Sequence, residues 1–326
     1  MTLTRDTRRA LEPALAPARP SALAAPACPA APAQDLDRAF AIAGGRVTGR
    51  AHQRLGQGCQ DGLAWYAGAD ALVAVVTDGC GSSQYSEVGA RLGARLLVAA
   101  IARELGLGRR RGPGPDAGSP DQPMAMSDAG IDAGLVQRAC SDVLDHLRAL
   151  ARAMGGDLAH TVAEHFLFTL VGAVVTRART LVFALGDGVV AINGAVHVIG
   201  PFPGNCPPYL GYRLLDPAAD TALSFQATWP TPAIDSLLLA TDGAGEILAH
   251  EGRALPGRDQ PAGPLAQFWT DDACVRNPDA VRRRLWLMSR EHVSPDWANR
   301  TLRRDPGILS DDTTLIAIRR RREAVP

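Results

Sequence analysis

The sequence predicts an α+β fold in which an antiparallel β-sandwich of two sheets is flanked by helices. Three observations predict it. Apolar runs of strand length recur along the chain, one Asn-Gly pair joins two of them as a hairpin, and two long amphipathic helices follow the first strands. Strands and helices do not alternate regularly, which excludes a doubly wound parallel sheet. The chain of 326 residues is long enough for one large domain.

In the first half of the chain, one strand and two helices are well defined. Residues 71–77 are continuously apolar and rich in valine, which predicts a strand buried on both faces. Residues 87–105 and 135–154 repeat apolar side chains at helical spacing, and the second helix ends at Gly155-Gly156. Residues 36–66 carry only short apolar stretches broken by glycine and polar residues.

The second half is dominated by strands. Residues 166–176 and 181–185 predict two strands, and residues 189–192 and 195–199 predict a hairpin, because Asn193-Gly194 suits a type I′ turn. Further strands are expected near 222–227, at 236–241 and at 315–319. Residues 245–305 are predicted to be mostly helix and loop, with the best helix at 281–290.

Composition divides the chain into a folded domain with an inserted loop and two tails. Residues 1–35 are rich in alanine and proline and predict a disordered tail. Residues 36–320 form the predicted domain, and residues 106–130, rich in glycine, proline and arginine, predict a mobile inserted loop. Residues 321–326 are a short basic tail.

The charge and the cysteines exclude several classes of function. The formal net charge is zero, so no overall field attracts nucleic acid or an acidic membrane. No apolar stretch reaches the roughly 18 residues that a membrane-spanning helix needs. The six cysteines form no Cys-x-x-Cys pair, which is typical of a reduced cytosolic protein rather than of a zinc site. We therefore expect a cytoplasmic monomer that binds neither nucleic acid nor a membrane.

Four acidic motifs suggest the chemistry of the chain. A carboxylate followed by glycine just past a buried strand is well placed to bind a hard cation, because glycine lets backbone carbonyls and water approach closely. If the four motifs converge in space, the chain holds Mg²⁺ or Mn²⁺. The motifs are Cys59-Gln60-Asp61-Gly62, Val76-Thr77-Asp78-Gly79, Ala240-Thr241-Asp242-Gly243 and Ser310-Asp311-Asp312-Thr313.

With these motifs, residues 40–319 resemble the PP2C-type metal-dependent protein serine/threonine phosphatases, in their bacterial branch. The order of the motifs is that of the family, although its paired-threonine strand is degraded here. The resemblance implies the helix-flanked double sheet. Besides the four acidic motifs, it rests on Gly49-Arg50-Ala51-His52, Phe168-Thr169-Leu170 and Leu185-Gly186-Asp187-Gly188.

The resemblance also implies roles for single residues. It makes Asp61 and Asp78 the catalytic carboxylates of a two-metal centre, with Asp78 bridging the ions, and it gives Asp187 to a third, weaker ion. The metal ligands that it implies are Asp61, Asp78, Gly79, Asp187, Asp242 and Asp311.

Some positions depart from the family pattern. Cys80 stands where many eukaryotic members carry a histidine proposed as a general acid. An arginine that grips the phosphate usually precedes the first metal-binding Asp, and here Arg50 and Arg54 are the candidates for substrate binding. His52 is a candidate catalytic residue that acts on the phosphate or the leaving group, and a structural hydrogen-bonding role is its alternative.

By this resemblance, the chain hydrolyses phosphoserine and phosphothreonine on proteins, using water activated at a binuclear Mn²⁺ or Mg²⁺ centre. Its expected partners are a phosphorylated protein and a cognate serine/threonine kinase. Two alternatives remain open. The departures at Cys80 and at the threonine strand favour a pseudophosphatase that binds phosphoproteins without turnover, whereas a missing phosphate-gripping arginine allows a hydrolase of small phosphate esters.

Overall fold

The computed structural model describes residues 35–107 and 131–321. All but the last residue of the predicted tail at 1–35 lies outside these residues, as do most of the predicted loop at 106–130 and all but the first residue of the predicted basic tail at 321–326. These assignments therefore stay predictions. No helix in the described part of the chain is both long and apolar enough to cross a membrane.

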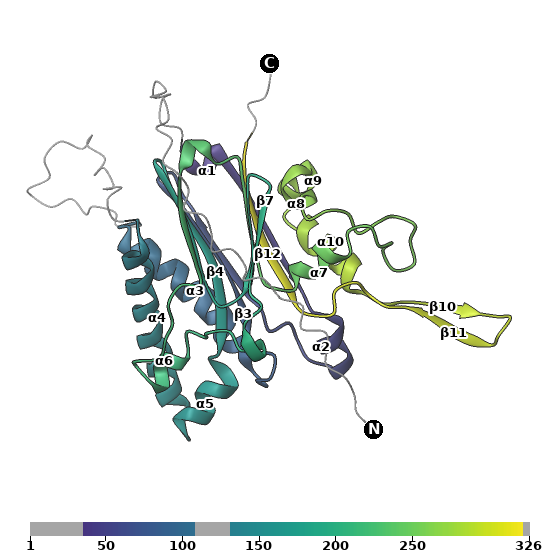
Figure 1. The fold of residues 1–326 in the computed structure, drawn as a ribbon, viewed down its shortest axis with the longest axis horizontal. Coiled ribbons are helices and arrows are strands. Elements are labelled where there is room, and N and C mark those ends of the chain that lie inside the picture. The colour runs from purple at the N-terminus through teal and green to yellow at the C-terminus, as the bar shows by residue number, and fades with distance from the viewer. Residues whose placement is uncertain (1–34, 108–130, 322–326) are drawn as a thin grey trace, which may run out of the picture. The chain divides into compact units, whose positions relative to one another are not determined.

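Two five-stranded antiparallel sheets form the centre of the fold (Figure 1). The first sheet has the order β1 (Phe40–Val47), β12 (Thr313–Arg320), β9 (Ser236–Ala240), β6 (Gly188–Ile192) and β7 (Ala195–Ile199). The second has the order β2 (Gly62–Ala67), β3 (Ala71–Gly79), β4 (Phe168–Thr176), β5 (Arg179–Leu185) and β8 (Phe225–Pro230).

Central strands of both sheets are buried on their two faces, as strand β3 illustrates. Leu72 and Val76 point into the core between the sheets, whereas Val73 and Val75 point into the core between the second sheet and its helices. This alternation follows from the two-residue period of a strand. A strand that lies between two cores needs apolar residues at every position, which explains its uninterrupted apolar run.

Helices cover the outer face of each sheet, so the layers are helix, sheet, sheet and helix. The predicted fold class is confirmed. The second sheet packs against α3 (Ser86–Glu104), α4 (Ala133–Met154), α5 (Leu158–His165) and α6 (Tyr212–Leu215). The first packs against α7 (Ala244–Ala249), α8 (Gln267–Thr270), α9 (Asp272–Arg276) and α10 (Ala280–Ser289).

Short elements complete the described chain. Helix α1 (Leu36–Ala39) precedes β1, and α2 (Arg50–Leu55) follows it. Two 3₁₀ turns, η2 (Pro203–Asn205) and η3 (Thr231–Ala233), lie in the connection that leads from β7 to β9.

Most of the predicted elements are confirmed within a few residues. The predicted hairpin is β6–β7, and both turn residues have positive φ, 48° at Asn193 and 86° at Gly194, as a type I′ turn requires. The strand expected near 222–227 begins three residues later, at Phe225.

Two parts of the prediction were incomplete or wrong. Residues 36–66 contain strands β1 and β2, which their glycines and polar residues conceal. The segment predicted to be helix and loop contains a third, two-stranded sheet, the hairpin of β10 (His292–Asp296) and β11 (Thr301–Asp305), which projects from the body in Figure 1. Its pattern is polar and includes Pro295, so its sequence lacks the apolar run by which the buried strands were found.

Candidate active site

Four of the predicted aspartates line a single cleft with a volume of about 110 Å³. Asp78 lies near the end of β3, Asp242 lies two residues after the end of β9, Asp311 precedes β12, and Asp187 lies between β5 and β6. Strands β9 and β12 are antiparallel, with Ala240 opposite Leu315, so the end of one and the start of the other meet at the same edge. Sequence motifs up to 233 residues apart therefore meet at one cleft.

Glycines allow the loops of this cleft to approach closely. A Cβ atom built on Gly79 would lie 2.7 Å from the carbonyl oxygen of Gln60, and one built on Gly243 would overlap the carbonyl oxygen of Asp312. Glycine is therefore needed after both Asp78 and Asp242, because no other residue fits without moving the neighbouring backbone.

Asp61 lies deeper than the other aspartates. Its side chain is completely buried, and its Oδ2 accepts a hydrogen bond from the Thr241 hydroxyl at 3.0 Å. Its Oδ1 is buried without a hydrogen-bond partner in the described structure. A buried carboxylate oxygen without a partner is costly, and a bound cation would remove that cost.

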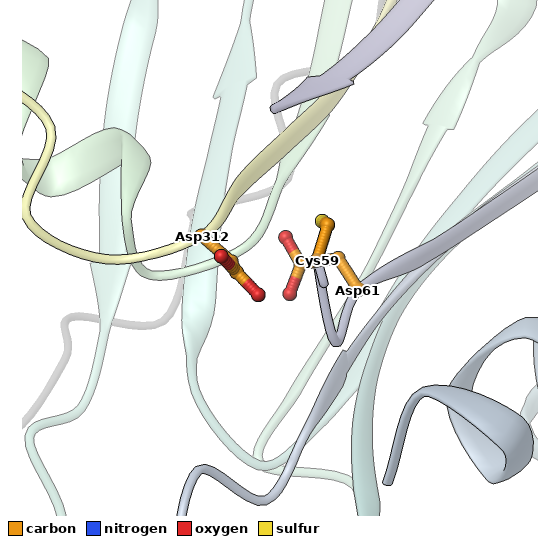
Figure 2. A group of neighbouring side chains, drawn as sticks. All are labelled: Cys59, Asp61 and Asp312. Carbon is orange, nitrogen blue, oxygen red and sulfur yellow. The ribbon is translucent and has the colours of Figure 1, made fainter. Parts of the chain in front are cut away.

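One group of potential metal ligands contains Cys59, Asp61 and Asp312, all buried (Figure 2). One ligand atom from each lies within 4.8 Å of the others. Asp312 reaches this position from the loop before β12, where its carboxylate accepts hydrogen bonds from the backbone N–H of Gly49 at 2.7 Å and of Gln60 at 2.5 Å. Of the predicted metal ligands, only Asp61 belongs to this group.

His52 lines the cleft from helix α2. Its Nδ1 lies 2.9 Å from Oδ2 of Asp312, although the pair lacks the alignment of a hydrogen bond. The imidazole is therefore held beside a buried carboxylate at the edge of the acidic cluster.

The crowding of carboxylates raises their pKa values. Burial, followed by the charge of Asp242, raises the pKa of Asp187 and of Asp311 to about 6. Burial and the charges of Asp61 and Asp242 raise the pKa of Asp78 well above its usual range, and burial with the charge of Asp312 raises that of Asp61. Burial and mutual repulsion therefore make the carboxylates resist being ionised all at once.

The two arginines predicted to bind substrate do not line the cleft. Arg50 lies on α2 and donates a hydrogen bond from Nη1 to the carbonyl oxygen of Gly307 at 3.2 Å, and Arg54 is exposed on the same helix. Their role in substrate binding stays a prediction.

Cys80 does line the cleft. Burial disfavours its thiolate, but its hydrogen bonds with Ser82 and Tyr209 outweigh burial and lower the pKa of the thiol. Its Sγ lies 3.1 Å from the hydroxyl oxygen of Ser82.

Sequence reasoning missed several residues of the site. Tyr209 and Asn205 line the cleft from the irregular segment that follows β7, where no local pattern marks them. Glu246 on α7 accepts hydrogen bonds from the backbone N–H and the hydroxyl of Ser310 and from the N–H of Asp311. It thereby fixes the loop that carries Asp311. Its only signal in the sequence is its position in the first turn of the helix that follows the Asp242 motif.

The residues present fit divalent hard cations. Carboxylates and a backbone carbonyl at Gly79 are the ligands that Mg²⁺ and Mn²⁺ prefer. A bound cation would lower the raised pKa values of the carboxylates. It would also give the unpartnered Oδ1 of Asp61 a ligand interaction.

Comparison with known proteins agrees with this site. The family model for protein phosphatase 2C matches residues 48–277, so the chain belongs to the protein phosphatase 2C family. It is therefore placed in an enzyme class, the protein serine/threonine phosphatases, as the motifs predicted. A search of curated proteins found no match.

Solved structures of phosphatases share the fold. A serine-threonine phosphatase 2C from Toxoplasma gondii has a TM-score of 0.52 and 14% sequence identity, and the match covers 86% of this chain and 95% of that one. The serine/threonine phosphatase Stp1 from Staphylococcus aureus has a TM-score of 0.44 and 12% identity, with 86% and 95% of the chains covered. At these identities the likeness concerns the fold alone, and only the first match is strong enough to support it.

Proposed function

We propose that this protein hydrolyses phosphoserine and phosphothreonine on proteins with two Mn²⁺ or Mg²⁺ ions bound in the cleft and a third held more weakly. The observation that supports this most strongly is the convergence of Asp78, Asp187, Asp242 and Asp311 on one cleft. No arginine of the described chain lines that cleft, so bound cations would supply positive charge for a phosphate there.

The acidic residues have distinct places in this proposal. Asp78, Asp242 and Asp311, with the carbonyl of Gly79, would hold the two principal ions, and Asp187 would hold the third. Asp61 would complete the centre from the buried side, where its Oδ1 has no other partner in the described structure. When bound, such ions supply charge neutralisation at the phosphoryl oxygens and lower the pKa of water.

Three further residues act in or beside the cleft. His52, held beside Asp312, is the group that we assign to the phosphate or the leaving group, because it is the imidazole that lines the cleft. Thr169 lies opposite Asp78 in the β3–β4 register and lines the same wall. Glu246 keeps Asp311 in place through Ser310.

Hydrolysis of a phosphothreonine peptide by the purified protein tests the proposal, with Mn²⁺, with Mg²⁺ and with EDTA. We expect turnover with metal and none with EDTA. Asp242→Asn should lower kcat/KM roughly 10²–10³-fold, since a cation contributes several kcal/mol to the transition state. Asp259→Asn, an exposed acid outside the cleft, is the matched control and should retain activity.

The alternatives give different results in the same experiment. Metal binding seen by calorimetry without turnover would contradict hydrolysis and favour a pseudophosphatase, for which Cys80 in the cleft is the motivating observation. Turnover of small phosphate esters but not of phosphopeptides would contradict the protein substrate. It would fit the placement of Arg50 and Arg54 outside the cleft.

A further inference from the structure

The hairpin of β10 and β11 has one face that is mostly apolar and exposed in the described structure, formed by Val293, Pro295, Leu302 and Arg304. Val293 lies opposite Arg304, and Pro295 lies opposite Leu302. Residues two apart in a strand share a face, so Val293, Pro295 and Leu302 lie side by side. Val293 is 42% exposed and Leu302 60% exposed.

The tip of the hairpin presents Trp297, which is 84% exposed. The turn is held by Asp296, which accepts hydrogen bonds from the backbone N–H of Asn299 at 3.1 Å and from its side-chain amide at 2.8 Å. These bonds lower the pKa of Asp296. The tryptophan is therefore displayed on an organised turn. An isolated two-stranded hairpin is only marginally stable, so its apolar face indicates a binding partner.

The edges of this hairpin are protected against strand pairing, which leaves the face as the contact surface. Pro295 has no N–H to donate on β10, and β11 carries Arg303 and Arg304 in succession. Proline and clustered charge are the features by which edge strands avoid pairing with another chain. Pairing of two β11 strands about Arg303 would also place like charges opposite each other.

The charge around the hairpin identifies the kind of partner. Helix α2 has two arginines and no acid, and residues 290–305 have four arginines against three acids, although the whole chain has no net charge. Arg300 forms no ion pair within 4.0 Å with any described residue. The surface that includes α2 and the hairpin is therefore basic, and it is complementary to an acidic polypeptide.

The hairpin is also joined structurally to the cleft. Arg50 of α2 binds the carbonyl of Gly307 next to the root of β11, and the backbone N–H of Arg50 binds the carbonyl of Leu309. Helix α2 presents His52 to the cleft, and the chain that leaves β11 reaches Asp311 six residues later. A polypeptide that places its phosphate in the cleft can thus extend over α2 to the hairpin.

We propose that the β10–β11 hairpin is a docking arm for the acidic phosphoprotein substrate, which it contacts through Trp297, Leu302 and the neighbouring arginines. This inference rests on the proposed function. The arm lies outside residues 48–277, the segment that matches the family model. The arm contributes affinity for the polypeptide of the substrate, whereas the cleft alone binds the phosphate.

The test compares two substrates, phosphorylated casein and p-nitrophenyl phosphate, with Mn²⁺ present. In the Trp297→Ala/Leu302→Ser variant we expect kcat/KM for phosphorylated casein to fall about tenfold or more through a higher KM, as for an interface hot spot. The value for p-nitrophenyl phosphate should not change. Val198→Ser is the matched control, since Val198 on β7 is also 60% exposed.

A second variant tests the charge contribution. Arg300→Glu/Arg303→Glu should lower kcat/KM for phosphorylated casein in the same way. Added salt should reduce the difference in kcat/KM between this variant and the wild type. Equal casein kinetics in wild type and both arm variants would overturn the proposal. Self-association of the wild type in sedimentation velocity that the Trp297→Ala/Leu302→Ser variant loses would also overturn it, because the face would then bind a second copy.

Binding measured in EDTA separates this proposal from the proposed function. If the wild type turns over neither substrate, the proposed function fails, but the arm is still tested by the affinity for phosphorylated casein. Weaker binding of phosphorylated casein by the two arm variants than by Val198→Ser would support the role of the hairpin as a docking arm. Equal binding by all of them, or no binding by the wild type, overturns it.

Discussion

The hydroxyl of Thr241 donates a hydrogen bond to Oδ2 of Asp61, although the two residues are 180 positions apart in the chain. The same hydroxyl oxygen accepts a hydrogen bond from the backbone N–H of Thr314 at 3.0 Å. One buried side chain thus connects the first and third acidic motifs with the residue that directly follows the fourth. The threonine that precedes Asp242 is part of the site although it does not line the cleft.

Replacing Thr241 by valine should destabilise the protein. Valine has nearly the same shape but leaves Oδ2 of Asp61 and the N–H of Thr314 unsatisfied, which costs about 1–3 kcal/mol for a buried polar group. Urea unfolding of the metal-free protein measures this cost. Thr241→Ser keeps the hydroxyl and is the control, so a serine variant as unstable as the valine variant would contradict this role of the hydroxyl.

Two glycines near Asp242 should respond in opposite ways to alanine. Gly243→Ala places a Cβ against the carbonyl oxygen of Asp312, whereas a Cβ at Gly245 meets nothing within 4 Å. We expect Gly243→Ala to lose activity and about 1–3 kcal/mol of stability through overpacking. Gly245→Ala, in the first turn of α7, should gain up to about 1 kcal/mol. Thermal unfolding and phosphopeptide turnover are measured for both variants. Equal stability and activity of the two variants would mean that the loops around Gly243 adjust to the added Cβ.

Glu246→Gln should weaken metal binding without unfolding the protein. Both carboxylate oxygens of Glu246 accept hydrogen bonds from Ser310, and an amide nitrogen cannot accept one of them. Loss of such a supporting residue typically costs 10–100-fold in metal affinity. Calorimetric titration with Mn²⁺ measures the effect. Glu251→Gln, an exposed acid nearby, should bind as tightly as the wild type.

The metal-free protein should lose stability as the pH rises from about 4 to 8. The pKa values of Asp187 and Asp311 are raised from 3.8 to about 6 in the folded state. The folded state therefore binds more protons than the unfolded state in this window, and its stability falls as these protons leave. The raised pKa values of Asp61 and Asp78 act in the same direction.

Thermal unfolding in EDTA across this pH range measures the effect. Mn²⁺ should raise the Tm more at pH 8 than at pH 5, because it competes with protons for the same carboxylates. A Tm in EDTA that rises steadily toward pH 8 would show that the clustered charges do not control stability.

The central strands could be predicted from the sequence because burial on both faces leaves a continuous apolar run, as at β3 and β9. Strand β1 could not, because its glycines serve contacts between distant segments. A Cβ at Gly45 would lie 2.6 Å from the backbone nitrogen of Arg282 in α10, and one at Gly44 would lie 3.0 Å from Leu63. Such glycines interrupt the alternation of apolar and polar residues along the strand. The need for them is visible only from the contacts in the folded structure.

The same distinction applies to the site. Asp78 and Asp242 could be predicted because each follows a buried strand and precedes a glycine. The position of Asp312 depends on backbone hydrogen bonds from the segment 49–60, which includes helix α2. No local pattern near Asp312 indicates these contacts. The contribution of Glu246 depends on a contact 64 residues away. The apolar face of the β10–β11 hairpin is visible only when its register is known.

The acidic cleft lies across the seam of the sandwich. Asp78 belongs to a strand of one sheet, Asp242 and Asp311 adjoin strands of the other, and Asp187 lies where the chain passes between them. An ion held by these residues would have ligands from both sheets and would therefore link the sheets at one end. Without the ion this end would lose that link while the apolar core between the sheets stays packed, so amide hydrogen exchange at the ends of β3 and β9 should report metal occupancy even when no substrate is present.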